Sequence, residues 1–240
     1  MPLAMSIAPR PPNQLLQALP NAEFEALRPR LKTFTMVRDT VLVEAGAALT
    51  HIYLPHSGAI SVMVRMSEGH AVEVAMIGRD SAVGAIEALG DGISLTEMVV
   101  LFPGIASLIE IADVRAAAAR SATVRSLLAR HGLALIAQAQ QSPACNASHS
   151  VEARMARWLL RARDLWDGET LPMTQELLAR MIGVQRNAIS IVAHALQEVG
   201  VISYSRGRIE IRDMDALQAT ACECHHAVTA KLARLLATPS

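Results

Sequence analysis

One stretch near the C-terminus, residues 173–212, limits the possible folds of this chain more than any other. It reads MTQELLARMIGVQRNAISIVAHALQEVGVISYSRGRIEIR. Thr174 is a good helix N-cap, and the apolar residues after it recur at helical spacing as far as Gly183. Glycine tolerates the left-handed backbone with which a helix often ends before a sharp turn. The sequence therefore predicts a short helix, a tight turn and a second helix over about 185–199.

A small hairpin is predicted after the second helix. Residues 201–204 and 208–211 have the character of strands, and they flank a turn that contains Gly207. Helix, turn, helix and hairpin in this order form a winged helix-turn-helix, which lays its second helix in the major groove of DNA. This layout predicts double-stranded DNA as a partner. The alternative is an ordinary helical hairpin with a solvated polar face.

The side chains at the start of the predicted second helix are suited to reading bases. Arginine can hold guanine through two hydrogen bonds, and glutamine or asparagine can hold adenine in the same way. Arginines on the hairpin are placed to reach phosphates. The predicted DNA-binding residues are Thr174, Gln175, Gln185, Arg186, Asn187, Ser190, Arg206 and Arg208.

The charge balance restricts how the chain can bind DNA. It has 22 basic and 22 acidic residues, so its affinity for DNA has to come from a local basic patch. Arginines crowd the C-terminal third and suggest such a patch: Arg154, Arg157, Arg161, Arg163, Arg180, Arg186, Arg206, Arg208 and Arg212.

The N-terminal half predicts an antiparallel β domain. Residues 33–112 contain short apolar runs of strand length, separated by turns with glycine and proline. Residues 1–12 have the character of a flexible arm, and residues 13–31 that of a short helical cap. We expect an α+β chain whose residues 13–112 form an antiparallel, jelly-roll-like β-roll.

A long helix is predicted over residues 113–149. Pro143 is expected to kink or break it. Five side chains along it follow alternating spacings of four and three, the pattern of a seam that pairs two helices. This seam consists of Val124, Leu128, His131, Leu135 and Gln138. It predicts a dimerisation helix, and the alternative is a helix that packs on its own β domain.

The chain resembles the Crp/Fnr family of bacterial transcription regulators from about residue 13 to 211. The stretch from 174 to 212 carries most of the resemblance, together with RMARWLL at 154–160, ACN with His149, and ACEC at 221–224. The resemblance implies a sensor similar to a cyclic-nucleotide-binding domain and a homodimer joined by the long helices. It also implies a winged helix-turn-helix domain over 150–214 that binds a palindromic operator, a helical tail over 215–240, and contact with RNA polymerase.

Two departures from the family pattern affect function. The Gly-Glu pair that holds the ribose in cyclic-nucleotide binders is Gly84-Ala85 here, and residues 93–97 lack the arginine for the phosphate. We therefore expect an unknown small-molecule effector other than cyclic AMP. In the second helix, Asn187 and Ile191 replace a usual glutamate and arginine, which predicts a different operator sequence.

Cysteines and histidines near the C-terminus suggest a possible metal-binding site. Cys222 and Cys224 precede two histidines, and Cys145 lies one helical turn before His149. The C-x-C spacing is short, and the sequence does not show a complete ligand set. We therefore predict a structural role, with no metal and no cofactor. Three cysteines exclude a four-cysteine iron–sulfur cluster within one chain. A regulator that responds to a metal, redox state or gas is the alternative.

Other function classes lack support in the sequence. It contains no nucleophile–base motif, Walker loop or dinucleotide-binding fingerprint, so we predict that the protein is not an enzyme. The competing class is a scaffold that uses the winged helix for protein contacts. The odd number of cysteines fits a reducing compartment, and no apolar run is long enough to span a bilayer. We expect a cytoplasmic protein without a membrane partner.

Overall fold

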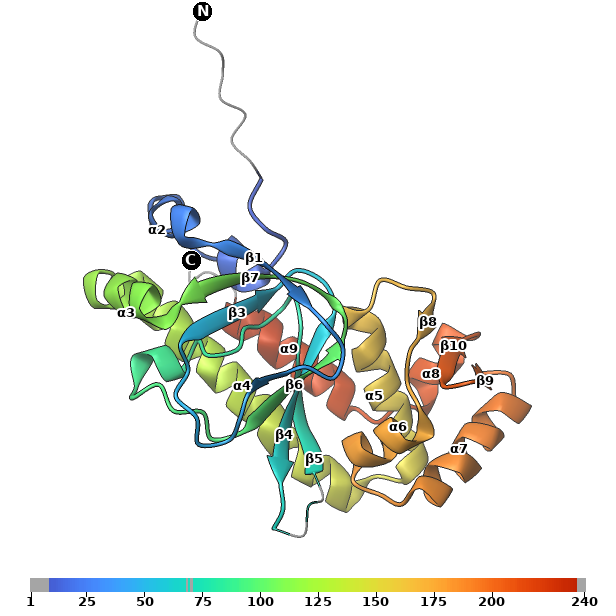
Figure 1. Cartoon of the computed structure of the whole chain (residues 1–240). Helices are drawn as coiled ribbons and strands as arrows, with labels where there is room; N and C mark the ends of the chain where they lie inside the picture. The colour runs from blue at the N-terminus through green and yellow to red at the C-terminus, as the bar shows by residue number, and fades with distance from the viewer. Residues whose placement is uncertain (1–8, 68, 70, 237–240) are drawn as a thin grey trace, which may run out of the picture.

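The structure is a computed structural model that describes residues 9–67, 69 and 71–236 (Figure 1). Residues 1–8 of the expected N-terminal arm lie outside the described residues. The rest of that arm is packed, because the Arg10 guanidinium donates hydrogen bonds to the carbonyls of Leu16 and Leu19, the latter at 2.7 Å. The same group lies 4.5 Å from the centroid of the Phe24 ring. Arg10 therefore anchors this part of the expected arm to the short helices that follow it.

Two antiparallel sheets form the N-terminal domain and confirm the predicted β fold. One sheet has the strand order β1-β7-β3 and the other β2-β6-β4-β5. The strands are β1 (Lys32–Met36), β2 (Val41–Val43), β3 (His51–Pro55), β4 (Ala59–Arg65), β5 (Ala71–Ile77), β6 (Glu97–Phe102) and β7 (Gly104–Glu110). The short helices are α1 (Gln14–Gln17), α2 (Asn21–Leu27), η1 (Arg28–Arg30) and η2 (Glu87–Leu89).

Strand β5 contributes to two hydrophobic cores at once. Successive side chains of a strand point to opposite faces of the sheet. Ala75 and Ile77 pack into the core of the β-roll, whereas Met76 packs into the core that also contains α5. The N-terminal domain, which we label the sensor after its predicted role, therefore shares buried apolar surface with the C-terminal domain.

The predicted long helix is two helices, α3 (Ile111–Arg120) and α4 (Ala122–Ser148). The expectation of one helix over residues 113–149 is therefore wrong. Ser121 has an extended backbone, and its hydroxyl oxygen accepts a hydrogen bond from Val124 N at 3.3 Å, so it caps α4. Pro143 lies inside α4 and does not end it.

The predicted coiled-coil seam faces the sensor of its own chain. Four of its members are buried: Val124, Leu128, His131 and Gln138. The Gln138 side-chain oxygen accepts a hydrogen bond from Met76 N at 2.7 Å, and His131 Nε2 accepts from Ala82 N at 3.1 Å. Assigning this seam to a dimer interface is therefore wrong. It packs on the β domain, which was the alternative.

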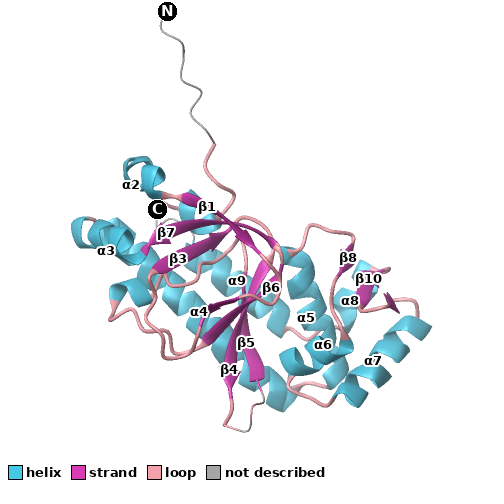
Figure 2. Cartoon of the chain, viewed as in Figure 1, coloured by secondary structure: helices cyan, strands magenta, loops and turns pink. Residues whose placement is uncertain are grey.

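The C-terminal region contains the predicted helices and hairpin (Figure 2). Its elements are α5 (Val151–Leu165), β8 (Thr170–Leu171), α6 (Gln175–Ile182), α7 (Arg186–Glu198), β9 (Ile202–Ser205), β10 (Arg208–Ile211), α8 (Met214–Thr220) and α9 (Cys224–Leu236). The sheet order is β8-β10-β9, so a strand that the sequence did not predict joins the hairpin. Helix α9 returns alongside α4 (Figure 1). None of the described helices is long and apolar enough to cross a membrane.

The loop after β5 connects the sensor to α5. Asp80 forms an ion pair with Arg161, with 2.5 Å between Oδ2 and Nη1, and both side chains are largely buried. Arg79 pairs with Asp167 at a more exposed position, so it does not face an open effector site. A Cβ at Gly78 would overlap the Leu165 side chain. Glycine at this position therefore allows the loop to approach α5 closely.

Candidate nucleic-acid interface and a cysteine–histidine cluster

The turn between α6 and α7 has the conformation that the sequence predicts. The Thr174 hydroxyl oxygen accepts a hydrogen bond from Leu177 N at 3.1 Å and so caps α6. Gly183 ends the helix in the left-handed region, with φ of 71°. Buried Leu178 and Ile189 join the two helices through their common core. This packing sets the angle at which α7 leaves the domain.

The first turn of α7 presents three polar side chains to solvent. Gln185, Arg186 and Asn187 are exposed. Gln185 occupies the N-cap position, but its side chain makes no capping hydrogen bond. Its amide is therefore available to a ligand, and the predicted base-reading residues lie together at the start of one helix.

Two of the other predicted DNA-binding residues contact each other. The Ser190 hydroxyl donates a hydrogen bond to Gln175 Oε1 at 2.6 Å. Both side chains are only partly exposed. This hydrogen bond links the start of α6 to α7, so the pair orients the helix as well as offering polar groups at its surface.

The hairpin turn places two arginines at its end. Arg206 has φ of 49° and Gly207 has φ of 75°, which is the backbone of a tight two-residue turn. Arg206 and Arg208 are exposed on either side of Gly207. This geometry suits contact with a phosphate backbone that passes α7.

The predicted basic patch is smaller than the sequence suggests. Arg154, Arg157 and Arg161 of α5 are buried, with exposed fractions of 7%, 4% and 6%. Their side chains lie in the interior of the protein and cannot contact DNA. The exposed members of the predicted set are Arg180, Arg186, Arg206, Arg208 and Arg212.

A cleft of about 1040 Å³ separates the sensor from the helix-turn-helix. Arg186 lines it on one side and Glu73 on the other. Glu73 is buried, and this burial raises its pKa to about 8 even though the Ser61 hydroxyl donates a hydrogen bond to it. Sequence patterns do not reveal such a group, because Glu73 occupies an ordinary position in a strand.

His131 fills part of the sensor interior. The ring is fully buried, and burial lowers its pKa to about 4, so it is neutral. Because Ala82 N donates to Nε2, this nitrogen is an acceptor, and the Ser81 hydroxyl also donates to it at 2.7 Å. The histidine thereby holds the loop after β5 against α4.

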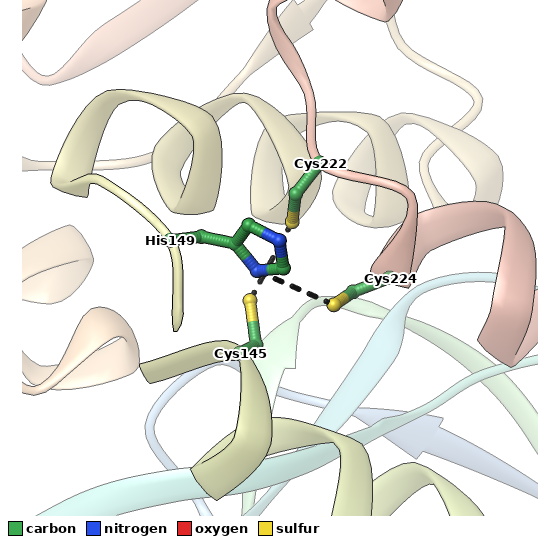
Figure 3. Close-up of side chains that lie close together, drawn as sticks. All are labelled: Cys145, His149, Cys222 and Cys224. Atoms are coloured by element: carbon green, nitrogen blue, oxygen red, sulfur yellow. Dashed lines mark hydrogen bonds between the residues drawn. The ribbon is translucent and has the colours of Figure 1, made fainter. Parts of the chain in front are cut away.

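Three cysteines and one histidine converge where α4 meets the C-terminal tail (Figure 3). We call this group the cysteine–histidine cluster, and it consists of Cys145, His149, Cys222 and Cys224. The sequence does not show a complete ligand set, but the fold brings four potential ligand side chains together. Cys222 precedes α9 and Cys224 is its first residue, so the two side chains are not held on different faces of one helix.

The cluster is enclosed. The three cysteines are buried and free, with exposed fractions of 0%, 8% and 1% in chain order. Burial raises the pKa of the Cys145 and Cys222 thiols, that of Cys222 to about 12. Cys145 and His149 are one helical turn apart in the sequence, but no sequence signal shows that α9 folds back beside them.

Comparison with known proteins agrees with this architecture. Residues 153–220 match the Crp-like helix-turn-helix domain family. No curated protein matches the sequence significantly.

Solved structures share the fold of the chain. FixK2 from Bradyrhizobium japonicum has 16% identity and a TM-score of 0.68, and the match covers 80% of this chain and 98% of FixK2. A Crp/Fnr-family protein from Eubacterium rectale has 18% identity and a TM-score of 0.69, with 86% and 96% covered. The c-di-GMP-responsive regulator CLP from Xanthomonas campestris has 14% identity and a TM-score of 0.62, with 81% and 100% covered. The chain thus carries a Crp-like helix-turn-helix domain, and it shares its overall fold with solved structures that include a Crp/Fnr-family protein.

Proposed function

We propose that this protein regulates transcription by binding a specific DNA sequence as a homodimer. The observation that carries the proposal is the exposed triplet Gln185-Arg186-Asn187 at the first turn of α7, within a Crp-like helix-turn-helix domain. Recognition helices usually contact base edges with the residues of this turn. Contact with RNA polymerase belongs to the same proposal.

The proposed DNA contacts divide into two groups. Gln185, Arg186 and Asn187 read base edges in the major groove. Arg206 and Arg208 contact phosphates from the hairpin, and the free hydroxyl hydrogen of Thr174 can do the same from the start of α6. Gln175 and Ser190 support α7 through their mutual hydrogen bond.

The direct test is selection of bound fragments from genomic DNA by the purified full-length protein, with and without candidate effectors. We expect enrichment of one palindromic motif whose half-sites are about one helical turn apart. The absence of any enriched motif in every condition would contradict sequence-specific regulation. A scaffold that uses the winged helix for protein contacts would give this result.

Replacing Arg186 with Ala is expected to weaken binding to the selected operator by about 1–3 kcal/mol and to relax the preference at one base pair. The reason is loss of a two-hydrogen-bond contact to a guanine. Fluorescence anisotropy on the operator and on random DNA measures both effects. Arg120→Ala, an exposed substitution on α3, is the control. Equal losses on operator and random DNA would show that Arg186 does not read a base.

A different face of α4 is available for the proposed dimer. Leu133 and Ile136 are large apolar side chains with exposed fractions of 56% and 51%. They continue a stripe at spacings of four and three, with Ala129 before them and Gln140 after them. This is the spacing of a coiled-coil seam, and it lies opposite the side chains that pack on the sensor.

Replacing Leu133 with Glu is expected to convert the dimer into a monomer at micromolar concentration, because a charge would be buried at the centre of the seam. Sedimentation velocity measures the change. Val37→Glu introduces the same charge at an exposed apolar position of the sensor and is expected to leave the dimer intact. A Leu133→Glu protein that remains dimeric would remove α4 from the proposed interface.

The effector is proposed to differ from cyclic AMP. At the family's ribose position, Ala85 is buried, and a Cβ at Gly84 would lie 3.0 Å from the Leu49 side chain. Apolar side chains therefore crowd the place where a carboxylate would be needed. A regulator of the same architecture that responds to a metal, redox state or gas is the alternative proposal.

A further inference from the structure

We propose that the cysteine–histidine cluster is a mononuclear, four-coordinate zinc site that fastens the C-terminal helix to the junction between α4 and α5. The proposal rests on the convergence of four side chains from two distant segments of the chain (Figure 3). It does not depend on DNA binding, because none of these residues lies on the proposed DNA-binding surface.

The spacing of the ligand atoms suits a single ion. The four atoms all lie within 4.8 Å of one another. Cys145 Sγ and Cys222 Sγ are 3.5 Å apart, and Cys224 Sγ is 3.6 Å from His149 Nδ1. With Zn–S bonds of about 2.3 Å, a tetrahedral site places its sulfurs roughly 3.8 Å apart. Small side-chain movements would therefore bring all four atoms into bonding distance of one ion.

The ligand types select the metal. Three thiolates and one imidazole form a common set for structural zinc, whereas calcium and magnesium need oxygen ligands. Four protein ligands also close the coordination sphere, which is the mark of a structural site and leaves no position for catalysis. Burial of the three cysteines agrees with a closed site.

A neighbouring carboxylate already holds the histidine ring in an orientation that suits metal coordination. His149 Nε2 lies 3.1 Å from Glu223 Oε2, so its N–H can donate to that oxygen. The lone pair of Nδ1 is then directed toward Cys224. A carboxylate on the far nitrogen of a metal-binding histidine is the usual outer contact that sets the ring tautomer and strengthens the ligand.

Other neighbours compensate the charge of such a centre. Zinc with three thiolates and a neutral imidazole carries one net negative charge. The buried Arg154 guanidinium interacts electrostatically with Cys145 and Cys222, and Arg157 interacts with Cys145. Gln141 donates a hydrogen bond to Cys224 Sγ at 3.2 Å, as outer-sphere donors do to metal-bound thiolates.

The position of the cluster shows what the ion would hold together. Cys145 lies near the end of α4, and His149 is the residue that follows the helix and leads into α5. Cys222 and Cys224 begin the return of the chain into α9. One ion would therefore fix the start of α9 to the α4–α5 junction. At this junction α4, which packs on the sensor, leads into the helix-turn-helix domain.

Two other uses of the sulfurs fit the structure less well. A disulfide between Cys145 and Cys222 would not require Cys224 and His149 to converge on the same point. In an iron–sulfur cluster the protein ligands bind different iron atoms, so they do not meet at one ion. Such a cluster also normally uses four cysteines, whereas this chain has three.

The first experiment is a titration of reduced, metal-free, full-length protein with Co²⁺, followed by Zn²⁺. We expect one Co²⁺ per chain, with the intense visible bands of tetrahedral coordination and thiolate charge transfer. Zn²⁺ should then displace it stoichiometrically. Elemental analysis of the protein as purified from zinc-containing medium should give one zinc per chain. The metal-bound protein should also melt at a higher temperature than the metal-free one.

Variants connect this binding to the named residues. Cys222→Ser should abolish stoichiometric binding. Glu223→Gln changes an exposed side chain outside the coordination sphere and should raise the dissociation constant for Zn²⁺ about 10–100-fold. His226→Ala, an exposed histidine two residues after Cys224, is the matched control and should bind as the unchanged protein does. Circular dichroism of each variant establishes that the fold is retained.

Several results would overturn the zinc site. One is failure of the folded, reduced protein to bind either ion. Another is unaltered binding by folded Cys222→Ser, which would place the ion elsewhere. A Cys145–Cys222 disulfide in protein purified without reductant, together with no metal uptake after reduction, would assign the sulfurs to redox chemistry. Iron and sulfide in anaerobically purified protein would replace the mononuclear site with a cluster.

Discussion

Replacing Asp80 with Asn is expected to lower the free energy of unfolding by about 3–5 kcal/mol, because it leaves the buried Arg161 guanidinium without its ion-pair partner. The two side chains are 13% and 8% exposed, and Arg161 also donates a hydrogen bond to Met76 O at 2.7 Å. The Asp80 carboxylate lies beside Arg161 and raises the pKa of the guanidinium against the opposing effect of burial. Urea denaturation of the full-length protein measures the loss.

The chain provides a matched control for this prediction. Arg79 and Asp167 form a second ion pair between the same loop and the end of α5, but the Asp167 side chain is 64% exposed. Asp167→Asn should therefore cost at most about 1 kcal/mol. The double variant Asp80→Asn, Arg161→Met should be more stable than Asp80→Asn alone, because no unpaired charge is left buried. Equal effects of the two Asp substitutions would contradict the role of burial.

Replacing Glu73 with Gln is expected to stabilise the protein by several kcal/mol at alkaline pH and hardly at all near pH 4. Burial raises the pKa of Glu73 from 4.5 to about 8 in the folded state. As the pH rises from about 4.5 to 8, the unfolded chain releases this proton while the folded chain keeps it. Stability of the unchanged protein should therefore fall by about 1.4 kcal/mol per pH unit from this group.

The difference between the variant and the unchanged protein should grow across this range and become constant above about pH 8, where both states are ionised. Glutamine keeps the shape of the neutral acid and has no proton to lose. Denaturation at about pH 5, 7 and 9 measures the difference, with Glu169→Gln at an exposed position as the control. A difference that does not depend on pH would show that Glu73 is ionised in the folded protein throughout.

The two predictions concern neighbouring parts of the same boundary. Glu73 borders the cleft between β5 and the helix-turn-helix, and the Asp80–Arg161 pair closes the boundary at the end of β5. Both the carboxyl group and the ion pair lie where the sensor meets the helix-turn-helix domain. Changes in their ionisation are therefore expected to alter the contact between the two domains.

The helix-turn-helix was predictable because its determinants are local. Thr174 caps α6 with its own hydroxyl, Gly183 supplies the left-handed residue, and the apolar spacing of each helix defines its buried face. The hairpin follows from the same kind of signal, a glycine turn between alternating residues. Each of these signals acts within a few residues, so it can be recognised in the sequence alone.

Helix α4 shows where such patterns fail. Two seams with the same spacing run along it, one through Leu128 and His131 and the other through Leu133 and Ile136. Spacing identifies a face that packs, but it does not say which partner it meets. The sensor covers the seam whose spacing predicts a dimer interface, and its backbone N–H groups at Ala82 and Met76 donate hydrogen bonds to His131 Nε2 and Gln138 Oε1 there.

The arginines of α5 and the cysteine–histidine cluster show the same limit. A count of arginines near the C-terminus does not separate buried Arg161 from exposed Arg206. Cys145 and Cys222 are 77 residues apart, and they meet only because α9 folds back along α4.

By itself, the sequence determined the helix-turn-helix and the antiparallel N-terminal domain. It also predicted a testable set of DNA-reading residues and the loss of the cyclic-nucleotide anchors. Those features depend on caps, turns, side-chain types and periodicity over short distances. Only the tertiary structure decided which face of α4 meets the sensor, which arginines are buried, and that four potential ligand side chains from two distant segments converge. Such contacts depend on how whole elements pack, and packing energies between distant segments leave no periodic trace in the chain.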